Sequence, residues 1–508
     1  MRQAPSASHC VLRSGLRIAA FAAILVLSGC LVGPDYERPP PATPPTPDYK
    51  ETSDSLFRPA QPRDTVDRGP WWDIYSDPTL TQLVAQVEVS NQNLKASEAA
   101  YRQAVALIRQ SQSALYPTFG YTGGVQQTGA GTSSGRTATV SGTSSQYSLG
   151  GTLTWEIDVW GNIRRTIESD SAAAQASYAT LAAARLSAQS SLVTNYYSLR
   201  VSDERRRLLE ATVAAYARAL EIVTNQKTAG TVSQLNVAQA QTQLEQTRAQ
   251  LVAEGVTRAQ FEHAIAALIG KAPAEFSLPP ATISDQVPTV EAGVPSALLE
   301  RRPDVASAER SMAAANAQIG VAVGAYYPQF TLNASINFVS TVLSTLLQIA
   351  NAVWAVGPQL AGTLIDGGSR AAQVEQARAN FDKTVATYRQ TVITAFQQVE
   401  DALAQQRILE QQEKVQRLAV AAARNAERTA LNQYGAGTVD YTTVVTSQTI
   451  ALQNEQTLLN VRLARYTASS NLVAAVGGGW RDSDMPPPVP IAGSETSREL
   501  KKKSWWPF

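Results

Sequence analysis

Few residues of this 508-residue chain have the side chains and the spacing that reaction chemistry requires. The sequence contains no motif of paired carboxylates, of a nucleophile beside a base, or of a phosphate-binding loop. His263 has no second histidine beyond the first 30 residues, and an isolated histidine is more often a packing residue than a ligand. The formal net charge of +1 argues against a nucleic-acid partner. The sequence therefore predicts a protein that is not an enzyme and that holds no metal and no cofactor other than a covalent lipid.

The lipid is predicted at Cys30. Basic residues precede an apolar run at residues 18–27, which has the length of a signal-peptide core and is too short to span a membrane. The run ends in Leu-Ser-Gly-Cys, which resembles the bacterial lipobox. We expect residues 1–29 to be removed and Cys30 to be acylated; the alternative is an ordinary signal peptide with a chance cysteine. Leu31 favours the outer membrane, because lipoproteins retained in the inner membrane tend to have aspartate there.

Any functional residues must be held in place by two long stretches that contain neither glycine nor proline. These stretches are Arg165 to Ala229 and Arg370 to Tyr434. Both are rich in good helix formers, and each would be about 100 Å long as a helix. Apolar residues recur four and three apart, as at Leu209, Val213 and Tyr216, so each helix should turn a seam toward a neighbour. The pattern predicts a coiled coil or a helical array, with a shorter helix after each long one.

Shorter segments have a different period. One helix is expected from Thr79 to Tyr116, and the residues after it alternate between apolar and polar. Trp155 and Phe338 should lie on an apolar face, and Thr154 and Asn337 on the opposite face. The pattern predicts two long hairpins of the kind that membrane barrels contain. Since about eight strands are the usual minimum for a barrel, four strands require several copies, and three copies would give twelve.

The chain repeats itself with an offset of about 210 residues. Tyr116-Pro117 recurs 211 residues later as Tyr327-Pro328, and Ala-Gly-Thr-Val at 229–232 recurs 207 residues later at 436–439. A repeat of this length indicates duplication into a two-fold pseudo-symmetric unit. The Pro-rich N-terminal segment is either a strap packed on the body or a linker without contacts. We divide the chain into a signal peptide (1–29), this N-terminal segment (30–70), a first repeat (71–280), a linker (281–300), a second repeat (301–480) and a basic, Pro-rich tail expected to be disordered (481–508).

Several motifs occur in an order that resembles a known family. They are Cys30 to Pro39, Trp71-Trp72, Trp155 to Asp158 with Trp160-Gly161, Leu299 to Asp304, and Gly477 to Trp480. Across roughly residues 30–480 the chain resembles the outer-membrane efflux proteins, the TolC-like and OprM-like channels, and most of all their lipoprotein branch, the NodT-type factors. The resemblance implies a mixed α/β membrane channel of a Gram-negative bacterium: a homotrimer with a twelve-stranded barrel in the outer membrane and a twelve-helix tube in the periplasm. It also implies a passive duct, linked by a periplasmic adaptor to an inner-membrane transporter of the RND type.

The resemblance assigns the helix tips to adaptor contact. These tips are Ala229, Gly230 and Thr231 in the first repeat and Ala436, Gly437 and Thr438 in the second. Glycine supplies the backbone freedom that a tight reversal needs, so the alternative is a turn with no further role.

The resemblance also places the periplasmic aperture just after the second tip, at Asp440, Thr442 and Thr446. Members of the family often have leucine and an acidic residue near the last two positions. This chain has threonine at both, so we expect an uncharged aperture instead of an acidic ring. Asp440 is the one nearby carboxylate of this segment, and its alternative role is that of a helix N-cap.

Three functions remain in competition. The first is the export channel of a pump for small molecules, and the second is the exit duct of a type I protein secretion system. The third, from a different class, is a periplasmic coiled-coil scaffold without a pore, which would have no use for two amphipathic hairpins. The exported substrate and the identity of the inner-membrane partner cannot be read from the chain.

Overall fold

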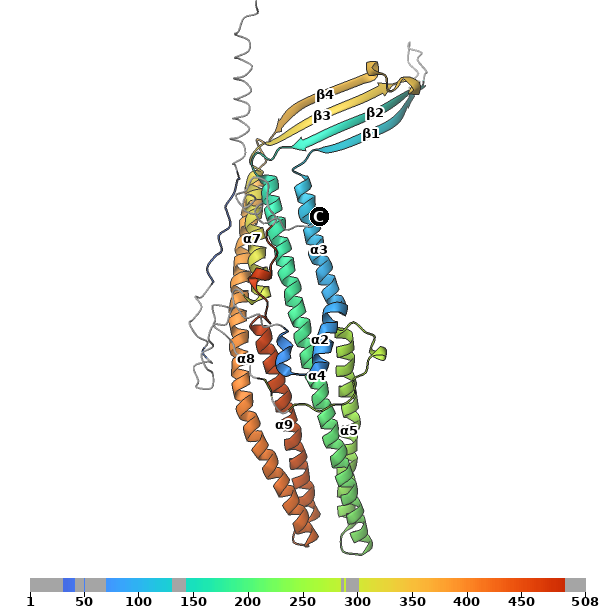
Figure 1. Ribbon diagram of the computed structural model, residues 1–508, viewed down its shortest axis with the longest axis vertical. Coiled ribbons are helices and arrows are strands. Elements are labelled where there is room, and N and C mark those ends of the chain that lie inside the picture. The colour runs from blue at the N-terminus through green and yellow to red at the C-terminus, as the bar shows by residue number, and fades with distance from the viewer. Residues whose placement is uncertain are drawn as a thin grey trace, which may run out of the picture.

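The computed structural model describes residues 31–41, 50, 70–129, 143–284, 287–288 and 301–488. It is a long helical rod with a β-sheet at one end and two helical hairpins at the other (Figure 1). The predicted signal peptide and Cys30 lie outside the described residues. The elements are η2 (Trp71–Tyr75), α2 (Pro78–Ser90), α3 (Gln92–Ser113), β1 (Thr118–Gly129), β2 (Thr143–Glu156), α4 (Asn162–Thr228), α5 (Gln234–Leu268), η3 (Pro273–Glu275), α7 (Pro303–Gly324), β3 (Gln329–Ser340), η5 (Leu343–Thr345), η6 (Ile349–Asn351), β4 (Ala352–Ala361), α8 (Ser369–Gly435), α9 (Tyr441–Ala475) and η7 (Asp482–Asp484).

The internal repeat is visible in the lengths of the helices. The long helices α4 and α8 both have 67 residues, which corresponds to about 100 Å. The returning helices α5 and α9 both have 35 residues, and α3 and α7 both have 22. The two long helices thus begin and end where the sequence predicts them. Within the described residues, no helix combines the length and the hydropathy needed to cross a membrane.

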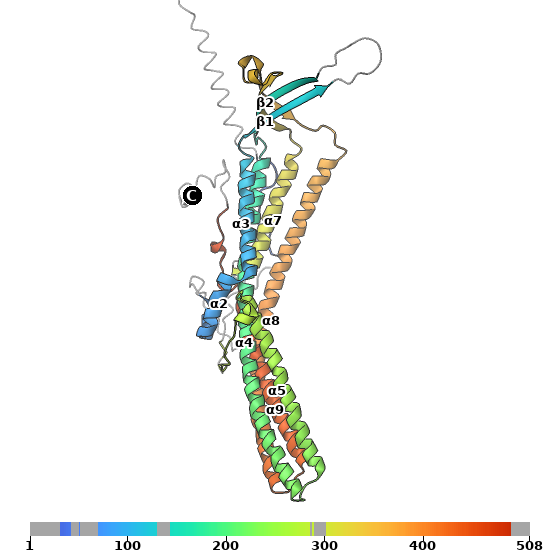
Figure 2. The same cartoon turned by 90° about the vertical axis from the view of Figure 1, so that its right-hand side faces the viewer.

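The four strands form one antiparallel sheet in the order β1-β2-β3-β4. Each strand pairs with its neighbour in the chain, so β1 and β4 are the edges of the sheet. The sheet leans to one side of the rod, and the helices lie below it (Figures 1 and 2). The apolar and polar alternation of the second hairpin predicts a return strand from Trp354 to Ile365, whereas β4 begins two residues earlier and ends at Ala361.

The helix predicted from Thr79 to Tyr116 is wrong, because the structure divides it at Asn91. The Asn91 backbone is extended, with φ −63° and ψ 121°, and its side-chain oxygen accepts from the backbone N–H groups of Asn93 and Leu94. Its amide also donates to the Leu268 carbonyl at 2.8 Å. Asn91 therefore ends α2 and caps α3. An asparagine side chain can hydrogen-bond nearby backbone groups, and this competes with continuation of the helix. The predicted start is correct to within one residue: α2 begins at Pro78, and the Asp77 side chain accepts from the backbone N–H groups of Thr79 and Leu80.

The largest apolar core lies halfway along the rod, where η2 and α2 pack on α4, α5 and α9. Three tyrosines stack at its centre: Tyr197 lies 4.0 Å from Tyr466 and 5.2 Å from Tyr75, measured between ring centroids. The Trp71 indole, which is buried, donates to Gln189 at 2.9 Å. We call this level the collar.

Candidate functional site: the two ends of the rod and the collar between them

The two faces of the sheet differ in chemistry. The register places Tyr121, Gly151, Ile336 and Trp354 in one row across all four strands. The next row contains Thr122, Gly150, Asn337 and Val353, which lie on the opposite face, and Val353 is the one large apolar residue of this row. The sheet therefore has one apolar and one polar face, and apolar side chains such as Tyr121 and Trp354 are largely exposed.

The predicted alternation is confirmed by this register. Phe338 lies on the same face as Ile336, and Thr154 lies on the same face as Asn337. Trp155 lies on the apolar face at the end nearest the helices, where its indole donates to the Leu115 carbonyl at 3.0 Å.

The two helix tips have the same backbone geometry. Gly230 has φ 76° and Gly437 has φ 74°, a left-handed conformation that side chains other than glycine rarely adopt. A Cβ at either position would meet no atom within 4 Å, so the conformation and not the space selects glycine.

Threonine then closes each tip. Thr231 donates from its backbone N–H at 3.0 Å and from its hydroxyl at 2.9 Å to the Gln226 carbonyl. Thr438 makes the same two bonds to the Gln433 carbonyl, both at 3.0 Å. Ala229 and Ala436, like the residues that follow them, are exposed. The tips thus form two matched surfaces at the end of the rod.

The predicted aperture residues lie together at the start of α9. Asp440 occupies the N-cap position, but its side chain makes no capping hydrogen bond and is exposed. The Thr446 hydroxyl donates to the Thr442 carbonyl at 2.9 Å, and the Thr442 hydroxyl accepts from Gln239 of α5 at 3.4 Å. Further along, Gln243 of α5 donates to the Thr449 hydroxyl at 3.1 Å. Uncharged polar groups therefore join the first hairpin to the second near the tips.

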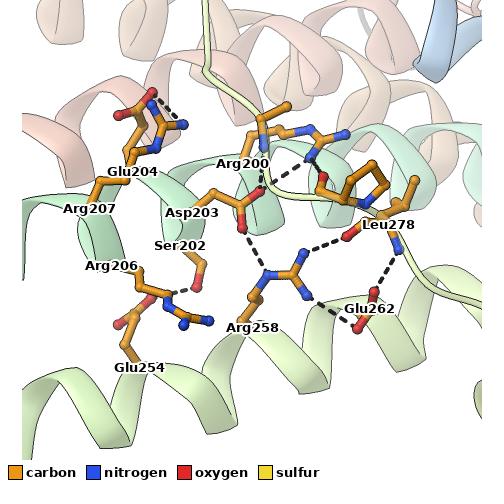
Figure 3. Close-up of polar contacts among 12 residues, drawn as sticks. Arg200, Ser202, Asp203, Glu204, Arg206, Arg207, Glu254, Arg258, Glu262 and Leu278 are labelled. Carbon is orange, nitrogen blue, oxygen red and sulfur yellow. Dashed lines mark hydrogen bonds and ion pairs between the residues drawn. The ribbon is translucent and has the colours of Figure 1, made fainter. Parts of the chain in front are cut away.

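Figure 3 shows a buried ionic cluster at the collar, which the sequence did not reveal. Asp203 of α4 is buried and accepts from Arg258 of α5 at 2.8 Å and from Arg200 at 3.2 Å. It also accepts from the backbone N–H of Ala281 at 3.2 Å. Because a buried carboxylate is costly without partners, these three donors fix α4, α5 and the chain after α5 together.

The same cluster holds the segment at residues 278–283 by its backbone. Arg258 donates to the Leu278 carbonyl at 2.6 Å, and the Leu278 N–H donates to Glu262 at 2.7 Å. Ile283 donates to Glu204 at 3.2 Å. The segment that leaves the first repeat is thus bound across the collar.

A second buried carboxylate, Glu413, occupies the corresponding hairpin of the second repeat. It accepts from Arg417 of its own helix and from Arg462 and Arg465 of α9. Burial raises the pKa of the Glu413 carboxyl, but the hydrogen bonds from Arg465 and Arg417 outweigh that effect and leave the pKa below its ordinary value. Buried carboxylates therefore fix each hairpin at the collar: Asp203 and Glu254 in the first hairpin, where Glu254 pairs with Arg205, and Glu413 in the second.

Arg302 and Asp304 have a structural role at the start of α7. Arg302 donates to both carboxylate oxygens of Asp304, at 2.9 and 2.6 Å, and to the Ala475 carbonyl at 3.0 Å. Asp304 lies in the first turn of α7, where the helix dipole favours a negative charge. His263, in contrast, is exposed on α5, so the packing role predicted for it is wrong.

Residues 31–41 lie along the upper rod as a strap. The buried Arg165 donates to the carbonyls of Val32 and Gly33, at 3.1 and 3.2 Å, and pairs with Asp35 at 2.8 Å. Gly33 has φ +99°, and a Cβ there would lie 2.4 Å from the Gly320 Cα. The strap therefore follows the rod closely, which its sequence alone left undecided.

The tail begins as an ordered segment. The amide of Gln175 donates to the Pro486 carbonyl at 3.0 Å, so the prediction of disorder is wrong for residues 481–488. Most of the predicted tail lies outside the described residues.

A rod of two helical hairpins, capped by an amphipathic sheet with two open edges, defines the class of elongated membrane-channel subunits. The chain belongs to the outer membrane efflux protein family, whose sequence model matches residues 83–271 and 294–478.

Relatives support the same conclusion over almost the whole chain. The chain is 31% identical over 478 residues to the probable efflux pump outer membrane protein TtgC of Pseudomonas putida, covering 92% of this chain and 95% of that protein. It is 27% identical over 472 residues to the cation efflux system protein CusC of Escherichia coli, covering 92% and 100%. The solved outer-membrane channel OprN is similar with a TM-score of 0.79 and 28% identity, covering 89% of this chain and all of that one.

Proposed function

We propose that this chain is the outer-membrane subunit of a tripartite efflux pump and forms a passive export duct for small molecules. The observation that carries the proposal is the four-stranded sheet, whose apolar face is exposed and whose edges β1 and β4 have no partner strand among the described residues. An open sheet edge is not stable in lipid, so the edges must pair with other copies. Three copies give a closed sheet of twelve strands with the polar face inside, and their hairpins give a tube of twelve helices below it.

The other parts of the proposal follow from this arrangement. The acyl chain on Cys30 anchors the subunit in the outer membrane, and the strap directs that end of the chain toward the sheet. The exposed tips at Gly230 and Gly437 bind the periplasmic adaptor, which connects the duct to an inner-membrane transporter of the RND type. No step in this function requires catalysis, so we infer that the protein is not an enzyme.

A type I secretion duct would use the same architecture. The efflux role is favoured because relatives that match over 90% or more of this chain are named as parts of efflux pumps, such as TtgC, and of cation efflux systems, such as CusC. A scaffold without a pore is disfavoured by the exposed apolar face of the sheet.

The test is single-channel recording of the purified protein in planar bilayers. Asp440, Thr442 and Thr446 should lie near the channel axis, and Thr446→Asp adds three carboxylates there. We expect the parent to conduct with weak block by divalent cations, and Thr446→Asp to be blocked at roughly tenfold lower concentration, because clustered carboxylates bind such ions. Thr228→Asp, at the end of α4, is the control and should behave like the parent.

An absence of conductance in the parent and all variants, with correctly inserted protein, would refute the duct. If divalent ions block the parent as strongly as Thr446→Asp, the aperture has another lining, and Asp440 is the first residue to replace.

A further inference from the structure

We propose that a basic stripe on α3 pairs with an acidic stripe on α8 of a second copy of this chain, and that this charge pattern sets the register of assembly. The basic stripe consists of Arg102 and Arg109, and the acidic stripe of Glu375 and Asp382. The inference rests on the proposed oligomer and concerns how its interfaces are matched. Figure 1 shows α3 and α8 at opposite edges of the upper rod, where neighbouring copies must meet.

The internal repeat provides the template for this contact. Helix α3 packs on α4, with Tyr101 and Tyr178 in ring contact at 5.3 Å, and α7 packs on α8 through the equivalent Met312 and Val385. Helix α7 also packs on α4, where the hydroxyls of Thr180 and Ser307 lie 2.9 Å apart. This last junction has no counterpart among the described residues of one chain. Its counterpart is α8 of one copy against α3 of the next.

The exposure of the two faces agrees with this equivalence. On α4, the positions under α7 are buried, and their equivalents on α8 are exposed. On α7, the positions that face α4 are buried, and their equivalents on α3 are exposed. The buried positions are 169, 172, 176 and 179 on α4 and 306, 313 and 320 on α7; their exposed equivalents are 376, 379, 383 and 386 on α8 and 95, 102 and 109 on α3.

Large and small residues exchange places between the two junctions. Within the chain, Arg165 of α4 lies against Gly320 of α7, where a Cβ would come within 2.9 Å of the arginine Cγ. At the equivalent junction α8 has the small Ala372, and α3 has the large Arg109. The arginine therefore comes from the other helix, and the space that it needs is available.

The carboxylate beside that arginine, in contrast, is found at the same position in both long helices. Arg165 pairs with Glu168 of its own helix at 2.8 Å. The equivalent of Glu168 is Glu375 of α8, which Arg109 of the neighbouring copy can therefore reach. The first interchain pair is Arg109 with Glu375.

The second pair lies one heptad away. Arg102 is equivalent to Ala313, and Asp382 is equivalent to Gln175, which accepts from Arg310 of α7 at 3.4 Å within the chain. The two helices are antiparallel at this junction. Seven residues toward the N-terminus of α3 therefore correspond to seven residues toward the C-terminus of α8. Both pairs therefore form in one register.

None of the four residues in the two stripes has an ion pair within the part of the chain that the structure describes. A slip by one heptad would leave one arginine and one carboxylate unmatched. Exposed pairs contribute little to total stability, so their main effect is on register. Lys95 extends the basic stripe but faces Lys383 at this junction, and we assign it no partner.

Charge reversal tests the pairing. We expect Arg109→Glu and Glu375→Arg each to lower, by several degrees, the temperature at which the detergent-solubilised trimer dissociates on native gels at low salt. The double variant should recover the parent value, and all differences should shrink in high salt. Lys95→Glu is the matched control: because Lys95 faces Lys383, reversing its charge should not lower the temperature. A double variant no more stable than either single variant, or a loss of equal size in Lys95→Glu, would overturn the pairing.

A cysteine pair tests the register independently of charge. Ala96 and Thr387 are equivalent to Ser307 and Thr180, so Ala96→Cys with Thr387→Cys should form disulfides between chains, seen as dimers and trimers on non-reducing denaturing gels. Ala100→Cys with Thr387→Cys should not, because Ala100 is equivalent to the exposed Ser311. A trimer without the first cross-link would refute this register and leave the duct intact, whereas a protein that forms no trimer would refute the proposed oligomer itself.

Discussion

At the scale of single residues, the described chain depends on buried carboxylates with several arginine partners. Asp203 and Glu413 both lie between a long helix and its returning helix, at the same level of the rod. Arg258 and Arg465 are equivalent in the repeat, whereas the carboxylates come from positions that are not equivalent: Asp203 corresponds to Glu410. The two repeats therefore have an arginine at the same position, but the buried carboxylate that pairs with it comes from different positions.

This arrangement predicts a pH dependence for Glu413. Its pKa in the folded chain lies below the ordinary value of 4.5, so the carboxylate stabilises the fold above that pH, and the contribution is lost as the pH falls through the lower, folded pKa. Glu413→Gln leaves three arginines without their carboxylate and should destabilise the fold at neutral pH by about 3–5 kcal/mol. Its stability should change less than that of the parent between about pH 5 and pH 3.

The measurement is thermal unfolding followed by circular dichroism over this pH range. Glu410→Gln is the control: Glu410 pairs with Lys414 at the surface, and such a pair contributes about 1 kcal/mol at most. Equal losses in the two variants would mean that Glu413 has no special role.

Sequence reasoning could not find these clusters. Asp203 and Glu413 lie in long, evenly polar helices, and nothing in the local pattern distinguishes them from charges on a solvated face. Their burial depends on the relative register of two helices, which composition does not determine. The glycine tips, in contrast, could be located because a left-handed turn leaves a residue-specific signature in the sequence.

At the scale of elements, the sheet makes a prediction about its two faces. Ile336 and Asn337 are neighbours in β3 whose side chains lie on the apolar and polar faces. Ile336→Arg should hinder membrane insertion at a cost of about 2–4 kcal/mol if the site lies near mid-bilayer, and Asn337→Arg should be tolerated.

Heat-modifiable mobility of the folded protein in outer-membrane fractions provides the measurement. Equal loss of folded protein in both variants would show that the two faces do not separate lipid from lumen.

The elements also show why some boundaries were predictable and others were not. The long helices lack breakers over their whole length, and the strands alternate clearly, so both could be placed within a few residues. The break at Asn91 was missed because it contains neither glycine nor proline, and it depends on the distant Leu268 carbonyl. The strap was undecided for a similar reason: its hydrogen-bond partner, Arg165, is more than 120 residues away.

At the scale of the whole molecule, polar bonds join the first hairpin to the second near the tips. If those bonds hold the closed state, Gln239→Cys with Thr442→Cys should form a disulfide between α5 and α9 and lower the open probability in planar bilayers. Reduction should restore it, because the hairpins can then separate.

The control pair lies within the second hairpin, where Gln416 donates to Asn454 at 3.0 Å. Gln416→Cys with Asn454→Cys should leave the conductance unchanged whether oxidised or reduced. A locked Gln239–Thr442 pair that conducts like the parent would show that α5 and α9 do not part when the channel opens.

The collar also fixes the point about which the lower part of the rod can tilt. From Arg205, which pairs with the buried Glu254, to the end of α4 the helix extends roughly 35 Å without a further ion pair to a buried carboxylate among the described residues. A helix held at that fulcrum acts as a lever, so a tilt of about 5 degrees moves its tip by about 3 Å. When three subunits tilt together, these displacements add around the axis. If an adaptor binds the tips as proposed, a small rotation, well within what packed helices accommodate, is enough to widen the opening between the tips.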